Sequence, residues 1–206
     1  MHAYSTNESR VPVYSILAII ALVVAWIIGW LTSLVEWPQW IVGAPSFGAV
    51  FAGTYRLFDL RIWHTPLARR LGLVMVEDLN GSYEGELVST FKDSSGKQVE
   101  REIRIDILQT WTHISVDMKV SSGTSSSTST SALGSVTRDG GSTRLAYIYR
   151  NRVNPGLADA DMGDHDGAAE LDVDLVGRMT GRYYNSRPRA GTIQVERVST
   201  APLAKS

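Results

Sequence analysis

The sequence predicts an N-terminal two-helix transmembrane hairpin followed by an all-β domain, an eight-stranded antiparallel up-and-down β-barrel. Three observations predict this fold. Charged side chains are scarce before residue 58, where only Glu8, Arg10, Glu36 and Arg56 occur. Two long uncharged runs lie in that same part of the chain. From about residue 81 onward, apolar and polar residues alternate with a period of two, the pattern of strands that are buried on one face.

The two uncharged runs are each long enough to cross a membrane. The first covers residues 11–35 and is dense in Ile, Leu, Val and Ala, and the second covers residues 37–55. A helix needs about 20 apolar residues to span the hydrocarbon core. A cleavable signal peptide is disfavoured for the first run, because the residues before it are barely basic, the run is too long, and a second run follows.

The second run carries a stripe of small residues. Ala44, Gly48 and Ala52 recur at intervals of four, so they share one helix face where another helix can approach closely. The partner is either the first helix of the same hairpin or a helix of another copy of the chain, and the sequence leaves both open. Pro38 suits the first helical turn, and Pro45 predicts a kink.

Flanking residues predict the orientation of the hairpin. Trp30, Trp37 and Trp40 cluster at the turn, which is typical of a membrane surface. Basic residues precede the first run and follow the second, so the positive-inside rule puts both termini in the cytoplasm. The predicted divisions are a tail at 1–10, two transmembrane helices at 11–57, a connector at 58–78, the barrel at 79–199 and a tail at 200–206.

The β domain shows eight candidate strands separated by turn residues. Ile103, Ile105 and Ile107 alternate with charged residues, and similar alternation continues through 113–120, 145–150 and 169–175. The remaining segments are 82–91, 124–137, 180–187 and 191–198. A closed sheet of eight strands has room for packed side chains or for one small ligand, which indicates a receptor rather than a channel.

The run from Ser121 to Ser131 contains only Ser, Thr and Gly. Its composition alone is that of a flexible linker. However, apolar residues follow at once, and a linker here would divide the strand series. We therefore expect its second half to be a strand whose small polar side chains leave room for a ligand.

Composition and motifs exclude several function classes. A net charge of −1 provides no general attraction to DNA or RNA, and the absence of Cys excludes a disulfide framework. No nucleophile elbow, P-loop, dinucleotide fingerprint or zinc motif occurs, so we expect no enzyme, no cofactor and no metal. The acidic segment 159–166 does not match a calcium loop, and His165 is better interpreted as a hydrogen-bonding group at a barrel rim.

Aromatic and guanidinium side chains recur in two separate strands. One strand carries Tyr147, Tyr149 and Arg150, and the other carries Arg182, Tyr183, Tyr184 and Arg187. Aromatic rings stack on nucleobases and guanidinium groups bind phosphates in a bidentate manner, so a pocket with both would suit a small nucleotide. The alternative is that the tyrosines belong to the core and the arginines are solvated.

Four features together resemble a known family. They are the two N-terminal spans; the segment 79–85, LNGSYEG, similar to an aromatic-centred LxGxWxG opening; His165-Asp166-Gly167 before an alternating strand; and the segment 181–187, GRYYNSR, similar to GxYYTxR. In this order they resemble the two-transmembrane, β-strand-rich effectors that are associated with CD-NTases in bacterial CBASS anti-phage defence. The chain departs from the pattern by Tyr83 in place of Trp and Asn185 in place of Thr.

The resemblance implies that the barrel binds a cyclic dinucleotide made by a partner CD-NTase. Binding would promote homo-oligomerisation in the inner membrane, whose disruption would stop growth. The implied ligand residues are foremost Tyr184 and Arg187, with Tyr83, Tyr147, Tyr149 and His165 as further candidates. The alternative that the residues leave open is a membrane-anchored, lipocalin-like carrier of a small apolar ligand.

Overall fold

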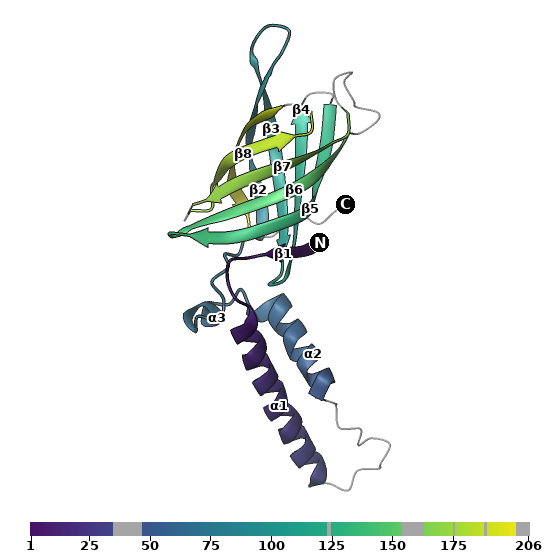
Figure 1. Ribbon diagram of the computed structural model, residues 1–206, viewed down its shortest axis with the longest axis vertical. Coiled ribbons are helices and arrows are strands. Elements are labelled where there is room, and N and C mark those ends of the chain that lie inside the picture. Colours follow the sequence, from purple (N-terminus) through teal and green to yellow (C-terminus); the bar gives the residue numbers. More distant parts are fainter. Residues whose placement is uncertain (35–46, 123–124, 154–162, 175, 188, 201–206) are drawn as a thin grey trace. The chain divides into compact units, whose positions relative to one another are not determined.

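The computed structural model describes residues 1–34, 47–122, 125–153, 163–174, 176–187 and 189–200 (Figure 1). The chain divides into two compact units. The helical unit is Glu8–Met75, and the β unit combines Met1–Asn7 with Val76–Ser206. An apolar N-terminal helix followed by a β-rich domain is therefore confirmed.

Among the described residues of the helical unit, one helix is long and apolar enough to span a membrane. This is α1, Val11–Ser33, with a mean hydropathy of 2.7 over its most apolar window. Its apolar residues are mostly exposed, while Val13, Leu17 and Ala21 form a buried stripe at intervals of four. Pro12 occupies the first turn, where a missing backbone N–H breaks no helical hydrogen bond.

The expected second span falls partly outside the described residues, since 35–46 are not among them. Its described part is α2, Phe47–Leu57, which contacts α1 and continues into the π-helical turn η1, Phe58–Ile62. Tyr55 of α2 packs against Tyr14 of α1, with ring centroids 6.1 Å apart. A short helix, α3, Pro66–Arg70, follows, and the hydroxyl of Thr65 caps it by accepting from the Ala68 N–H.

Each of the eight predicted segments contains a strand among the described residues, and a further strand precedes them. The strands are β1 His2–Ser5, β2 Gly81–Lys92, β3 Gln98–Gln109, β4 His113–Ser122, β5 Ser125–Asp139, β6 Ser142–Val153, β7 His165–Val173, β8 Met179–Asn185 and β9 Ala190–Ser199. From β2 to β9, each strand pairs antiparallel with the next, and β9 pairs back to β2. The sheet is thus a closed barrel, in which nine strands take part among the described residues where eight were expected.

The ninth strand, β1, lies where β4 and β5 separate. β4 and β5 pair from Ser122 and Ser125 down to Asp117 and Thr130. Beyond that point β1 lies between the two strands and pairs with both, antiparallel with β4 and parallel with β5. Sequence patterning missed β1 because a four-residue strand is too short to show a period.

Side-chain contacts hold β1 in this seam. Tyr4 is 4% exposed and donates its hydroxyl to the Trp111 carbonyl over 3.0 Å. The His2 ring lies 2.9 Å from the Ser131 hydroxyl, and the Asn7 amide group bonds both backbone groups of Arg138. A Cβ at Gly134 would crowd the His2 ring, so the glycine at this position makes room for β1.

Inward-facing residues of consecutive strands fill one half of the barrel. Ile105, Ile107, Ile114, Leu145, Leu171 and Ile193 are almost fully buried, as their alternation predicts. Each large aliphatic side chain that is fully buried stabilises the folded protein by about 1.5–3 kcal/mol. This packed half supports the other half, in which the interior is open.

Candidate functional site

The open half of the barrel interior holds a cavity of about 470 Å³. Inward-facing residues from β2 to β8 line it, together with Arg189, which precedes β9. This volume lies within the range of small-molecule sites. The lining is mainly aromatic and polar, and it includes Ser89, Phe91, Arg101, Ser127, Ser129, Tyr149, Asn151, His165, Tyr183, Asn185 and Arg189.

Two tyrosines form the aromatic part of the cavity wall, and glycines on neighbouring strands give their rings room. A Cβ on Gly167 would collide with the Tyr149 ring, and a Cβ on Gly191 would collide with the Tyr183 ring. Burial raises the pKa of Tyr149. Burial also raises the pKa of Tyr183, although the Ser89 hydroxyl and the Arg189 charge lower it in part. Both phenols are therefore neutral at physiological pH and offer a flat apolar face with a polar edge.

The part of the wall beside Tyr149 is polar and built from small side chains of β5, which pairs with β6. Ser127 and Ser129 are 6% and 2% exposed, and the Ser129 hydroxyl donates to Asn151 Oδ1 over 2.8 Å. At the end of the same wall, His165 Nδ1 lies 3.0 Å from the Gly163 carbonyl oxygen. The prediction that this Ser/Thr run forms a strand is confirmed, as is the interpretation of His165 as a hydrogen-bonding group at the rim.

Beyond Tyr149 lies a buried hydroxyl that has no partner among the described residues. Tyr147 occupies the next inward position of β6, its ring centroid is 6.1 Å from that of Tyr149, and it is 3% exposed. Its hydroxyl oxygen and Asn185 Oδ1 are both buried without a hydrogen bond in the described part of the chain. Leaving such a group unpaired costs about 1–3 kcal/mol, and of the two residues Asn185 lines the cavity, where a polar ligand would supply the missing partner.

Cationic groups stand at the mouth of the cavity. The Arg189 guanidinium lies 4.0 Å from the centre of the Phe91 ring, which holds it in a cation–π contact. Arg101 reaches the same mouth from β3. The charged side chains of the lining are these two guanidinium groups and one carboxylate, that of Asp93, so positive charge is in excess and the entrance favours an anionic ligand. Both arginines and Phe91 were missed from the sequence, because single residues near strand ends show no pattern.

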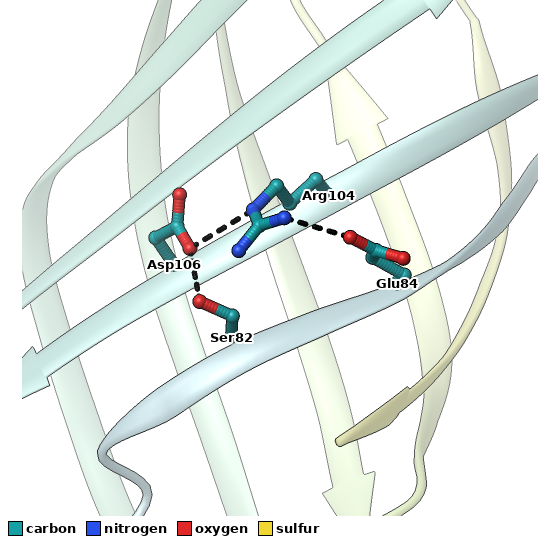
Figure 2. Close-up of polar contacts among 4 residues, drawn as sticks. All are labelled: Ser82, Glu84, Arg104 and Asp106. Atoms are coloured by element: carbon teal, nitrogen blue, oxygen red, sulfur yellow. Dashed lines mark hydrogen bonds and ion pairs between the residues drawn. The ribbon is translucent and has the colours of Figure 1, made fainter. Parts of the chain in front are cut away.

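A larger groove of about 930 Å³ lies on the outer wall, but its charges oppose an anion. Glu84, Glu86, Glu102 and Glu196 line it, against Arg104 and Lys119. Figure 2 shows that Arg104 is already engaged: its Nη1 lies 2.7 Å from Glu84 and its Nε lies 3.2 Å from Asp106. The Ser82 hydroxyl donates to the same Asp106 oxygen over 2.5 Å. This network ties β2 to β3 on the outside of the barrel.

The structure brings together only some of the residues expected from the sequence. Tyr149 and His165 line the cavity and Tyr147 lies behind Tyr149. Tyr184 is 52% exposed on the outer face of β8, and Arg187 lies against Gly163 in the loop after β8. Neither of these two belongs to the cavity lining.

Tyr83 lies in the packed half of the interior, away from the cavity mouth. Its hydroxyl donates to the Leu79 carbonyl over 2.9 Å and accepts from Arg197 Nη2 over 2.6 Å. These bonds tie the start of β2 to β9. On α2, Gly48 and Ala52 are exposed rather than packed against α1, and Ala44 lies outside the described residues.

No group of three or more potential metal ligands occurs among the described residues, which include only the last part of the acidic segment, 163–166. The donors around the cavity are hydroxyls, amides, guanidinium groups and one imidazole. This set is suited to recognising a polar, anionic organic molecule.

Two comparisons with known proteins match the chain. The family model described as "Cap15, cyclic dinucleotide receptor domain" matches residues 74–197, more than half of the 206-residue chain. The CD-NTase-associated protein 15 of Yersinia aleksiciae is 28% identical over 169 residues, covering 80% of this chain and 75% of that protein. The whole cavity lining falls inside the matched residues, whereas β1 and α1 fall outside the family model.

Proposed function

The chain belongs to the Cap15 cyclic dinucleotide receptor family, and from this membership we propose that it is a CBASS anti-phage effector whose barrel binds a cyclic dinucleotide made by a CD-NTase. Strands β2 to β9 are the eight-stranded receptor barrel of this proposal, and β1 is an addition to it. The proposed protein is a ligand-controlled effector rather than an enzyme.

The single observation that carries the proposal is the cavity. Its tyrosine rings, two guanidinium groups and polar side chains match the three parts of a cyclic dinucleotide, namely base faces, phosphodiesters and base edges. In this assignment, Tyr149 and Tyr183 contact the bases and Arg101 and Arg189 contact the phosphates. Asn151, His165 and Asn185 supply hydrogen bonds at the base or sugar, and Tyr147 supports Tyr149 from behind. Arg187 and Tyr184 act from outside the cavity.

The membrane part of the proposal rests on the helical unit. Residues 11–57 form a transmembrane hairpin in the bacterial inner membrane, with both termini in the cytoplasm. Ligand binding promotes self-association of the chain, and the exposed Gly48 and Ala52 then pack α2 against helices of other copies, which disrupts the membrane. A ligand drives this change only if it binds the assembled form more tightly than the single chain.

The test uses the full chain in lipid nanodiscs and a panel of cyclic dinucleotides: cyclic di-AMP, cyclic di-GMP, cyclic di-UMP, cyclic GMP–AMP and cyclic UMP–AMP. Calorimetry should show binding of at least one, weakened about tenfold or more by Arg189→Gln, since charge-assisted hydrogen bonds contribute about 1.5–3 kcal/mol. Arg178→Gln is the matched control, because Arg178 is paired with Glu196 on the outer wall.

Lack of binding by every member of the panel would refute the proposal. If lipid copurifies in the barrel instead, the apolar-ligand carrier becomes the better explanation. Leakage of dye from liposomes that contain the full chain, with and without the bound nucleotide, tests the membrane step separately.

A further inference from the structure

A continuous apolar row crosses the outside of the barrel on β5, β6, β7 and β8, the face formed by these four neighbouring strands (Figure 1). Leu133 pairs with Ile148, Ile148 with Ala168, and Ala168 with Tyr184. Leu133, Ile148 and Tyr184 are 60%, 50% and 52% exposed. Single exposed apolar residues are ordinary, but a row in direct register over four strands is typical of an interaction surface.

The charges beside this row are arranged in opposite pairs on the two central strands. On β6, Arg150 and Arg144 face outward, and on β7 their cross-strand partners are Asp166 and Asp172. The Arg150–Asp166 and Arg144–Asp172 pairs are 3.1 and 2.9 Å long and well exposed. One central strand is therefore positive and the other negative on both sides of the apolar row.

A hollow lies at one end of the row and a protruding ring at the other. The hollow, of about 550 Å³, opens over β5 and β6 beside a bulge at Ala132, and Thr130, Ile148 and Arg150 border it. The protruding ring is Tyr184, on β8. Within one chain the two are separated by about three strand spacings, roughly 14 Å, so a chain cannot fill its own hollow.

These three features fit one arrangement of two identical faces. A two-fold axis parallel to the strands, midway between β6 and β7, sets β6 of one copy over β7 of the other and β5 over β8. Arg150 and Arg144 then meet Asp166 and Asp172 of the second copy. Ile148 meets Ala168, and Tyr184 reaches the hollow beside Leu133. Residue i contacts j and j contacts i, as a two-fold interface requires.

The charges also distinguish this axis from a second possible two-fold axis. A two-fold axis along the strands leaves both copies pointing the same way along them. An axis along the apolar row would turn one copy upside down, and it would set Asp166 against Glu170 of the second copy. Like charges in contact disfavour that alternative.

We propose that the β5–β8 face is the surface through which the receptor barrel binds a second copy of this chain, with Tyr184 of each copy as an anchor at either end of the row. The inference builds on the proposed self-association but requires no particular ligand. It gives Tyr184 a role that its position outside the cavity otherwise leaves open. The apolar row provides the affinity, and the exposed ion pairs, which contribute little energy each, select the orientation.

The absence of cysteine from the natural sequence makes thiol cross-linking a direct test. In the double variant Leu133→Cys, Tyr184→Cys, the two thiols of one chain are about 14 Å apart, whereas each faces a thiol of the second copy across sheets packed about 10 Å apart. A short bismaleimide should therefore give a covalent dimer of the full chain in nanodiscs from the double variant and far less from either single variant. The matched control is Lys119→Cys, Glu196→Cys, whose exposed positions are also three strands apart in register on the opposite wall.

A second measurement uses no cross-link. Ile148→Asp should weaken self-association by about tenfold or more, because each interface would bury two unpaired carboxylates. Val198→Asp, at a similarly exposed apolar position of β9, should leave it unchanged. Association is measured by analytical ultracentrifugation in detergent, with and without the nucleotide panel.

The outcomes separate this inference from the proposed function. Selective trapping that does not respond to any nucleotide supports the interface and counts against ligand-controlled assembly. Self-association that is insensitive to Ile148→Asp, or equal trapping of the control pair, overturns the interface while leaving ligand binding intact. A chain that remains single under every condition overturns the inference as well.

Discussion

Removing the Tyr147 hydroxyl should stabilise the free protein. In Tyr147→Phe, the lost group is a buried hydroxyl that has no hydrogen bond in the described part of the chain. Its burial costs about 1–3 kcal/mol. Removing one oxygen leaves a void of roughly 15 Å³, and this cavity lowers stability by about 0.4 kcal/mol. The net gain is therefore about 1–2 kcal/mol.

The same substitution at Tyr83 should have the opposite sign. Tyr83 is also buried in the barrel, but its hydroxyl donates to Leu79 and accepts from Arg197. Tyr83→Phe removes these bonds and leaves a charged donor without its acceptor. The expected loss is about 1.5–3 kcal/mol. The two variants thus apply one chemical change to two environments in the same domain.

Thermal unfolding of the full chain in detergent, followed by circular dichroism of the β signal, measures both effects. A gain of 1–2 kcal/mol corresponds to a rise of roughly 4–8 °C, and Tyr83→Phe should lower the midpoint by a similar or larger amount. Calorimetry with the bound nucleotide should show little change in affinity for Tyr147→Phe, because Tyr147 does not line the cavity. If Tyr147→Phe destabilises the protein as Tyr83→Phe does, the hydroxyl is paired in the free protein and the reasoning is wrong.

Three further predictions concern the cavity and its rim. Gly167→Ala should destabilise the barrel by about 1–3 kcal/mol, because the new methyl collides with Tyr149, while Ala168→Ser beside it should be nearly neutral in thermal unfolding. Ser129→Ala should lower stability by about 1 kcal/mol and weaken nucleotide binding, since it leaves Asn151 Oδ1 without the Ser129 donor; Thr128→Ala, at the exposed neighbour, is the control. The Ser95 hydroxyl and the Lys97 and Ser95 amides lower the pKa of Asp93. The Asp93 carboxylate therefore stabilises the β2–β3 turn at any pH above the ordinary aspartate pKa. This stabilisation is lost as the pH falls through the lowered pKa of the folded protein. Amide exchange protection of Ser95 and Lys97 should fall between pH 6 and pH 3 in the natural chain and be low at both in Asp93→Ala.

Alternation predicted the strands because the barrel has one buried face and one wet face. Ile103, Ile105 and Ile107 are buried where their period places them, and Tyr147 and Tyr149 face inward for the same reason. Periodicity also places Tyr183 inward and Tyr184 outward, although the motif alone favoured Tyr184 as a ligand contact. A motif gives order along the chain, whereas the pleat decides which side chain reaches the interior.

The cavity could be predicted only in part, because its cations depend on contacts between distant segments. Arg189 is held by Phe91, almost a hundred residues earlier, and Arg101 reaches the mouth from a third strand. No spacing in the sequence brings them together. The small residues of β5 were informative, because Ser127 and Ser129 are narrow enough to leave the interior open beside them.

The position of β1 makes the receptor a discontinuous domain. The chain starts the barrel with residues 1–7, leaves it for the entire helical unit, and returns at residue 76. A shortened chain that begins at residue 76 therefore keeps the cavity but loses the strand between β4 and β5. It exposes unpaired edges that readily capture other strands. The barrel and the helical unit cannot be separated by a single cut, and an isolated barrel needs residues 1–7 joined to residue 76 by a linker.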